Sequence, residues 1–233
     1  MNDQADTHDH DPHTHSHDGD VDPFDEKAET WDDDPAHLER ARMVADRIAQ
    51  EVALNPSIRL LEFGAGTGSV TENLLSRIGQ ATLADRSGGM RAVMERKVES
   101  GRLAGARVID LDLESDPTRC SNSSKVTADQ VGPFDLILSV LTLHHVDDPK
   151  SMLGAFRQLL EVDGQIGVVD LDAEDGSFHG EGFGGHHGFD RRKITEDLSA
   201  AGFDEIRVLD CGRIARDDGD YTMFLAIGHR SES

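Results

Sequence analysis

A chain of 233 residues with a formal net charge of −23 is long enough to bury one large α/β domain, or one domain with an appendage. Such an acidic chain repels phosphate backbones, and no Lys/Arg stripe opposes the repulsion, so nucleic acid is not expected as a partner. No apolar run approaches the ~20 residues that span a bilayer, so no membrane partner is expected either.

Residues 1–22 form an acidic, His-rich tail without apolar periodicity, which we expect to be disordered. The tail does not resemble a basic and then apolar secretory signal, which favours a cytoplasmic location. Cys120 and Cys211 are then expected to be reduced thiols. The tail histidines are candidate ligands for a divalent metal such as zinc, nickel or copper; the alternative is a solvated extension with incidental metal affinity. They are His8, His10, His13, His15 and His17.

Residues 23–233 are expected to form one domain that begins with a helical segment. Asp34 followed by Pro35 is typical of an N-cap and a first helical position. Apolar residues then recur every three or four positions until Pro56, which predicts a helix with one buried stripe. The stripe consists of Leu38, Ala41, Val44, Ile48 and Val52.

From Ile58 onward, short apolar runs alternate with helical patterns, which predicts a doubly wound, mostly parallel α/β sheet covered on both faces. The last two runs are separated by a turn-rich connection and no helix, so we expect seven strands that end in an antiparallel C-terminal hairpin. The expected strands are 58–63, 81–84, 107–111, 134–140, 165–171, 205–209 and 221–227. The expected helices are 70–78, 90–98, 152–160 after a second Asp-Pro start at Asp148 and Pro149, and 194–201.

The run LLEFGAGTGSV, residues 60–70, places three glycines directly after the first strand of this series. The backbone amides and helix N-terminus at such a turn suit a nucleotide-like ligand. The sixth position counted from Gly64 is Ser69, so the dinucleotide fingerprint G-x-G-x-x-G/A is incomplete. Asp85 ends the second strand of the series, where a carboxylate can accept both hydroxyls of a ribose. These residues predict a ribose-containing ligand but leave a dinucleotide and other nucleosides open.

Further segments follow the glycine turn in a fixed order. LLEFGAGTG is followed by LADRSGGM, IDLDLES, FDLILSVLTLHHVDD and EVDGQIGVVDL. Together they resemble the successive motifs of class I S-adenosylmethionine-dependent methyltransferases over residues 24–229, and the resemblance implies a Rossmann-like fold with S-adenosylmethionine as cofactor and S-adenosylhomocysteine as product. The upstream FDEKAETWD is similar to the segment that folds over the cofactor in many members, which implies an N-terminal helical lid.

The resemblance also implies a role for the residues around the turn. Glu62 would orient the amino group of the cofactor, directly or through water. Gly64 and Gly66 would let the methionine portion lie against the main chain. Asp85 would accept hydrogen bonds from the ribose hydroxyls, although an acid at a strand end is often a helix cap or a solvated loop residue.

The adenine is implied to lie beside the next strand ends. Arg86 would flank the ring, Asp112 would accept from its exocyclic amine, and Leu113 would offer a backbone contact. Asp110 is an alternative to Asp112, because strand alternation places the two on the same face.

Three further residues are implied on the methionine and acceptor side. Ser139 and Val140 close the fourth strand and would line the sulfonium side. Trp31 would line the pocket from the lid; a packing anchor is the alternative.

Histidines are the candidates for a catalytic base, which the reaction needs only where the acceptor atom carries a proton. His144 and His145 follow the fourth strand, and His186 and His187 lie in the Gly-rich connection after the fifth. All four are expected at the carboxyl edge of the sheet. Packing or helix capping is the alternative role for the first pair.

A metal could instead be held in the Gly-rich connection by His179, His186 and His187, assisted by Asp170 or Asp172. No i, i+4 pair on a helix supports this, so no metal site is assigned within the domain.

Absent motifs narrow the acceptor. The stretch after the fourth strand reads SVLTLHHV and lacks the Asn/Asp-Pro-Pro-Tyr/Phe run of adenine and glutamine amino-methylating enzymes, and neither cysteine follows a proline as cytosine C5 enzymes require. We therefore expect a small-molecule methyl acceptor. The alternatives are an NAD(P)-dependent oxidoreductase of Rossmann type and a non-catalytic protein that binds the cofactor or a metal.

Overall fold

The computed structural model describes residues 22–111, 113, 131–216 and 219–232. The five tail histidines, Cys120 and Asp112 lie outside the described residues, so the predictions made for them are not addressed by the structure. Among the helices of the described ranges, none combines the length and apolar character needed to cross a bilayer.

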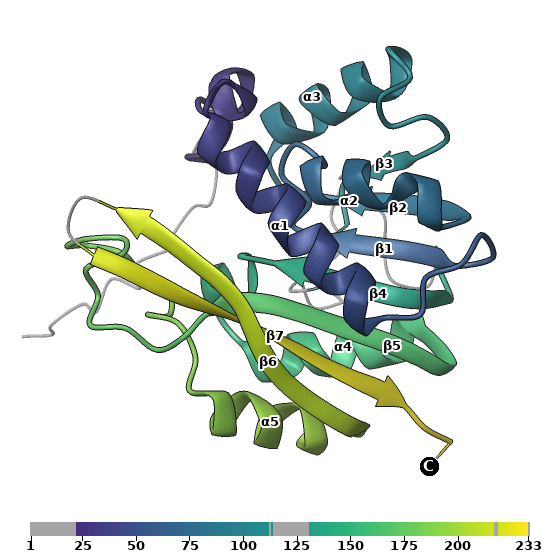
Figure 1. Cartoon of the computed structure of the whole chain (residues 1–233), viewed down its shortest axis with the longest axis vertical. Coiled ribbons are helices and arrows are strands. Elements are labelled where there is room, and N and C mark those ends of the chain that lie inside the picture. Colours follow the sequence, from purple (N-terminus) through teal and green to yellow (C-terminus); the bar gives the residue numbers. More distant parts are fainter. Residues whose placement is uncertain (1–21, 112, 114–130, 217–218, 233) are drawn as a thin grey trace, which may run out of the picture.

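The described residues form one seven-stranded sheet in the order β3-β2-β1-β4-β5-β7-β6 (Figure 1). Neighbouring strands from β3 to β5 are parallel, whereas β7 runs antiparallel to both β5 and β6. The predicted mostly parallel sheet with a C-terminal antiparallel hairpin is therefore confirmed. The strands are β1 Arg59–Phe63, β2 Gln80–Ala84, β3 Arg107–Ile109, β4 Phe134–Val140, β5 Leu160–Leu171, β6 Phe203–Arg216 and β7 Gly219–Arg230.

Five α-helices and three short 3₁₀ helices accompany the sheet in the described ranges. Asp34 accepts a hydrogen bond from the Ala36 amide and Asp148 accepts one from the Ser151 amide, so the two predicted Asp-Pro helix starts are confirmed. The α-helices are α1 Pro35–Glu51, α2 Ser69–Leu74, α3 Gly88–Glu99, α4 Pro149–Leu159 and α5 Arg191–Ala200. The 3₁₀ helices are η1 Ala28–Asp33, η2 Leu75–Arg77 and η5 Leu143–His145.

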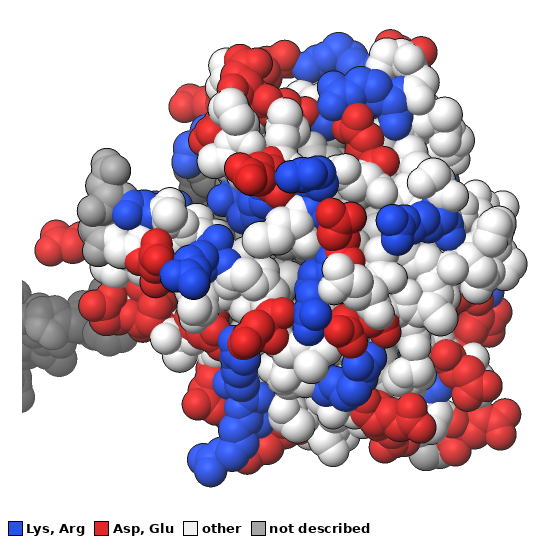
Figure 2. Space-filling view, in the orientation of Figure 1, with Lys and Arg blue, Asp and Glu red and all other residues white. Residues whose placement is uncertain are grey.

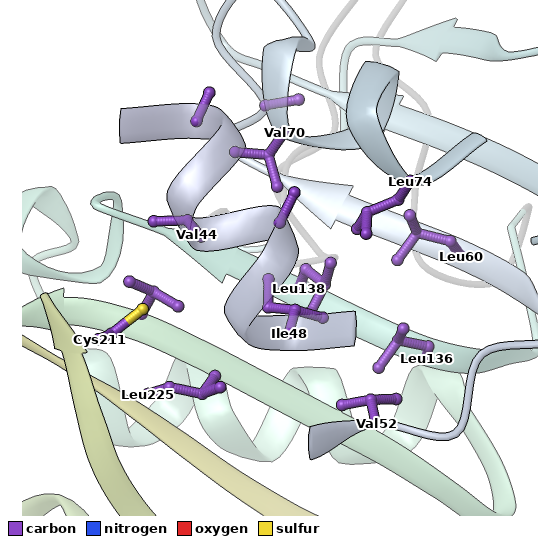
Figure 3. Close-up of a cluster of buried hydrophobic side chains, with 14 of the residues drawn as sticks. Val44, Ile48, Val52, Leu60, Val70, Leu74, Leu136, Leu138, Cys211 and Leu225 are labelled. Atoms are coloured by element: carbon purple, nitrogen blue, oxygen red, sulfur yellow. The ribbon is translucent and has the colours of Figure 1, made fainter. Parts of the chain in front are cut away.

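Alternate strand residues point to two separate cores. On β1, Leu60 packs in the core beneath α1 and α2, whereas its neighbour Leu61 packs in the core beneath α4 and α5. Figure 3 shows Val44 and Ile48 of α1 facing Leu138 of β4 in the first core. Helices thus cover both faces of the sheet, and the carboxyl ends of β1, β2, β4 and β5 remain available for ligands.

Some predicted boundaries are wrong. Leu38, assigned to the buried stripe of α1, is 38% exposed, because the contacts of the helix with the core begin one turn later at Ala41. The last two strands are longer than the apolar runs 205–209 and 221–227, since β6 is an edge strand whose exposed residues carry no apolar signal.

Basic and acidic side chains are interspersed on the face of the molecule that Figure 2 shows. Ion pairs of the described residues include Arg207 with Glu51 at 2.7 Å and Arg59 with Asp135 at 2.9 Å. Exposed pairs of this kind contribute little to stability, about 0–1 kcal/mol each.

Candidate active site

Three glycines shape the turn between β1 and α2, and the space beside them differs. All have left-handed backbones, with φ of +70° at Gly64, +57° at Gly66 and +76° at Gly68. A Cβ on Gly64 would lie 2.2 Å from the Thr142 side chain, and one on Gly68 would lie 2.9 Å from Leu103. A Cβ on Gly66 would meet no atom within 4 Å. The protein itself therefore fills the space beside the outer glycines, and only Gly66 faces open space.

The Asp85 carboxylate at the end of β2 lies beside the open part of the turn. It accepts hydrogen bonds from the Gly66 amide at 2.7 Å and from the Ser87 amide at 2.9 Å. Burial raises its pKa to about 6, and the two amide bonds oppose that rise. The side chain is thus held by the backbone against the cradle that Gly66 leaves bare.

Glu62, on β1 directly before the turn, is buried and lines the same cavity. Its carboxylate accepts from the amide of Thr71 at 3.2 Å and from the hydroxyl of that residue. Burial raises the pKa of Glu62 to about 7, an effect that the Thr71 hydrogen bonds partly offset. An amino group in the cavity would find here a carboxylate fixed in place.

The segment that precedes α1 is attached to the turn through acidic residues. Asp32 accepts from the Thr67 hydroxyl at 2.7 Å and pairs with Lys97 at 2.6 Å. Although burial raises the pKa of Asp32, the hydrogen bonds from Lys97 and Thr67 outweigh it and hold the pKa below its usual range. Asp25 accepts from the Ser87 hydroxyl at 2.6 Å and from the Gly89 amide at 2.9 Å at the start of α3.

Aromatic rings of the same segment close over the cavity. Phe24 lies edge-to-face against His145 with ring centroids 5.4 Å apart and against Trp31 at 6.0 Å. Trp31 stacks on His37 at 4.2 Å, and both rings line the cavity. Residues 22–37 thus contact the glycine turn and line the cavity beside it, and a role as a lid stays a prediction.

A cavity of about 2070 Å³ extends from the glycine turn along the carboxyl edge of the sheet and between α1 and the last residues of β6. It exceeds the roughly 300–1,000 Å³ that one drug-sized ligand occupies, so a nucleoside and a second molecule fit together. Of the residues predicted to bind the cofactor, those that line it are Glu62, Gly64, Gly66, Asp85, Arg86, Leu113, Val140 and Trp31.

Some predicted cofactor residues are placed differently. Ser139 is fully buried and is not among the described lining residues, because strand alternation directs it to the same face as Ile137. The Arg86 side chain is 77% exposed and pairs with Asp22 at 3.1 Å. Asp110, the alternative to Asp112, lines the cavity and pairs with Arg91 at 3.3 Å.

The turn after β4 brings histidines into the cavity. The ring of His144 lies 4.1 Å from that of His145 and 5.0 Å from that of His179, measured between centroids. His179 comes from the connection between β5 and α5. Asp170 of β5 lies behind the cluster, with a carboxylate oxygen 2.7 Å from His144 Nδ1. These three histidines line the same cavity as Asp85.

His186 and His187 do not belong to this cluster, contrary to their predicted catalytic role. His186 donates its amide hydrogen to the His144 carbonyl at 2.7 Å and places Nε2 3.1 Å from the Val146 carbonyl, so it attaches the loop to η5. His187 faces Glu174 at 3.3 Å, and its side chain is 43% exposed. Neither is among the described residues that line the cavity.

Two important residues are charged at positions where the pattern predicts an apolar residue. Lys97 follows Met90 and Met94 in the apolar stripe of α3, where a charge indicates a buried partner, and the sequence interpretation did not use it. Asp170 interrupts the otherwise apolar end of β5 in the same way, and it was considered only as an assistant to a metal site in the Gly-rich connection. Asp25 and Asp32 carried no comparable signal, since their contacts depend on how the segment folds back.

Comparison with known proteins gives consistent matches. A family model described as a methyltransferase domain matches residues 36–208. An uncharacterized methyltransferase of Geobacillus kaustophilus is 31% identical over 163 residues, which cover 69% of this chain and 63% of that protein. Fusarielin synthase of Gibberella zeae is 30% identical over 139 residues, which cover 57% of this chain and 5% of the synthase. The chain thus spans less than two thirds of either relative.

A solved structure shares the fold. It is a SAM-dependent methyltransferase from Aquifex aeolicus, with a TM-score of 0.61 and 17% identity, and the match covers 88% of this chain and 97% of that one.

Proposed function

We infer that this chain, which belongs to the class I S-adenosylmethionine-dependent methyltransferase family, methylates a small-molecule acceptor. The observation that carries the proposal is the bare backbone at Gly66 beside the Asp85 carboxylate, opening into a cavity with room for a second molecule. Family membership supports methyl transfer over the alternative of NAD(P)-dependent oxidoreduction.

The residues of the cradle fit the cofactor. Asp85 accepts from the ribose hydroxyls, and the Gly66 and Ser87 amides keep its carboxylate in place for that contact. Glu62, held by Thr71, accepts from the amino group of the methionine portion. Bound S-adenosylmethionine supplies a methyl group on a sulfonium that leaves readily as a thioether.

Alignment is the main task of the other lining residues. Leu141, directly after β4, has a φ of +51°, and its amide donates to the Val169 carbonyl at 2.8 Å. A non-glycine residue in this region costs about 1–3 kcal/mol and is held here by the sheet. The strained backbone fixes Val140 and Thr142 on either side of it, and a fixed wall is what in-line displacement requires.

Two observations support a small acceptor. Aromatic side chains line the cavity, Phe24 and Trp31 from residues 22–37 and Phe178 and Phe183 from the connection after β5, as is common in sites for small molecules. Fusarielin synthase, one of the relatives, is by its name an enzyme that makes fusarielin, and the match covers 5% of it.

The test is to incubate the protein with methyl-labelled S-adenosylmethionine and a cell extract, and then to separate small molecules from protein and nucleic acid. We expect label in the small-molecule fraction, and none with the Asp85→Ala variant. Label confined to a macromolecular fraction would overturn the small-molecule proposal. Cofactor binding without turnover on any fraction would favour the non-catalytic alternative.

A further inference from the structure

We propose that His144, His145 and His179 form a binding site for a divalent transition-metal ion of the zinc type at the acceptor end of the cavity. One nitrogen atom from each ring can be chosen so that the three lie within 4.8 Å of one another. The site is distinct from the tail histidines and from the predicted set of His179, His186 and His187.

The geometry is close to that of a bound site. Ligand nitrogens at a Zn–N distance of about 2.0–2.1 Å in a tetrahedral site lie about 3.3 Å apart. The nitrogens here would have to approach by at most about 1.5 Å, a shift that rotation of the half-buried His145 and His179 side chains can supply.

Asp170 fixes the ring of His144 for this role. Its carboxylate accepts from the His144 amide at 3.2 Å and from the Leu171 amide at 2.8 Å, in addition to lying 2.7 Å from His144 Nδ1. Because the carboxylate acts as the acceptor in all three contacts, Nδ1 carries the hydrogen and Nε2 carries the free lone pair in the neutral ring. A carboxylate behind a histidine is the usual second partner of a metal-binding imidazole.

The nitrogens left over have no partner in the described part of the chain. His144 is 2% exposed, and its Nε2 is buried without a hydrogen bond. The Nε2 of His179 is also buried and unpaired. Buried polar atoms are nearly always hydrogen-bonded, so two such atoms on adjacent rings indicate an absent partner. A single cation satisfies both.

The surroundings keep the rings in the form that binds metal. Burial, together with the neighbouring imidazoles, lowers the pKa of His145 to about 3 and that of His179 to about 4, so both are neutral at pH 7. Asp170 and Glu174 contribute negative charge near His179, which Arg216 opposes. Neutral imidazoles suit zinc, copper, nickel and iron, whereas magnesium and calcium prefer oxygen ligands.

Three protein ligands are the number found in catalytic zinc sites, which leave the fourth position for water or substrate. An acceptor oxygen or sulfur could occupy that position; this consequence rests on the proposed function, whereas the metal site itself does not.

The test uses the full chain with the five tail histidines replaced by glutamine, here called the tail-substituted chain, titrated with Zn²⁺ in a calorimeter. We expect one Zn²⁺ per chain. His145→Gln and His179→Gln should each weaken that binding at least tenfold, and Asp170→Asn about 10–100-fold. Co²⁺ provides a second measurement, because tetrahedral coordination gives strong visible absorption that His179→Gln should abolish.

His187→Gln is the matched control, since it removes an imidazole from the same loop but outside the cluster, and it should leave Zn²⁺ affinity unchanged. S-adenosylhomocysteine binding, measured on the same samples, reports whether each variant is folded. The inference is overturned if the tail-substituted chain binds no Zn²⁺, or if His145→Gln and His179→Gln bind it as well as the control does. Either result with intact S-adenosylhomocysteine binding leaves the proposed function standing, whereas metal binding without S-adenosylhomocysteine binding would count against that function alone.

Discussion

Two parts of the cavity, called the cofactor end and the acceptor end after their proposed roles, are built differently. At the cofactor end, Asp85 and the glycine turn lie at the ends of adjacent parallel strands, and backbone amides hold the carboxylate. At the acceptor end, His144 and His145 lie on a short 3₁₀ turn, and His179 comes from a long connection. The first end depends on sheet geometry, and the second depends on how loops fold against each other.

We therefore expect mutations at the two ends to have different consequences. The cofactor end is part of the sheet, so changes there affect both binding and stability. The acceptor end is carried by connecting segments, which tolerate variation in sequence and adapt to different ligands.

Asp85→Ala is the variant for which we expect the largest effect on cofactor binding. The variant loses charge-assisted hydrogen bonds to the ribose hydroxyls at about 1.5–3 kcal/mol each, so the affinity for S-adenosylhomocysteine should fall about 100-fold or more. Calorimetry measures it. His179→Gln, at the other end, should change this affinity by less than about threefold, a difference within ~0.7 kcal/mol. Equal losses in the two variants would show that the ends are not independent.

Alanine substitutions at Gly66 and Gly68 should act differently, because the space beside Gly66 is open whereas protein atoms fill the space beside Gly68. Gly68→Ala introduces a Cβ 2.9 Å from Leu103 at a φ of +76°, and should lower the free energy of unfolding by about 2 kcal/mol. Gly66→Ala meets no neighbour, so it should cost about 1 kcal/mol of backbone strain but weaken S-adenosylhomocysteine binding at least tenfold.

Gly101→Ala is the matched control for Gly66→Ala. Gly101 has a φ of +84°, and a Cβ there also meets nothing within 4 Å, but the residue lies at the end of α3 away from the cavity. Denaturant unfolding should show a similar loss of stability for Gly66→Ala and Gly101→Ala. Unchanged cofactor affinity in Gly66→Ala would mean that no ligand occupies the space beside this glycine.

Asp32→Ala measures how much the attachment of the N-terminal segment to the glycine turn contributes to the free energy of unfolding. Removing the carboxylate leaves the buried Lys97 with Glu72 at 3.4 Å as its remaining acidic partner among the described residues. We expect a loss of about 2 kcal/mol in unfolding free energy, below the 3–5 kcal/mol of a fully buried pair, since Asp32 is partly exposed. The exposed neighbour Asp33→Ala is the control and should change stability by less than about 0.5 kcal/mol.

The features that could be predicted from the sequence lie in the sheet and at the glycine turn rather than in the histidine cluster. The series of strands and helices, the antiparallel C-terminal hairpin and the helix starts at Asp34 and Asp148 follow from periodicity and capping chemistry, which act over a few residues. The position of Asp85 beside the turn follows because both lie at the carboxyl ends of parallel strands. The histidine cluster could not be predicted in the same way. Which histidines come together depends on how the rings of His144 and His145 are oriented and on where the long connection that carries His179 folds.

The attachment of the N-terminal segment was also beyond local patterns. Asp25 and Asp32 contact residues 62 and 35 positions away, and an acidic stretch offers many equivalent carboxylates for such contacts. The isolated charges in apolar positions, Lys97 and Asp170, were the usable signals, because burying a charge without a partner is too costly to occur by chance.

The smallest expected effect is a pH dependence confined to the cofactor end. Burial raises the pKa of Asp85 to about 6, and the ribose hydroxyls need the ionised carboxylate as acceptor. The contribution of Asp85 to S-adenosylhomocysteine binding should therefore be complete above about pH 7, and its loss should lower the affinity about tenfold by pH 5, one unit below that pKa. Glu62, whose pKa burial raises to about 7, titrates in a neighbouring range. Asp85→Asn separates the two: the dependence between pH 5 and 6 should disappear in this variant, whereas a profile unchanged by the substitution would assign it to Glu62.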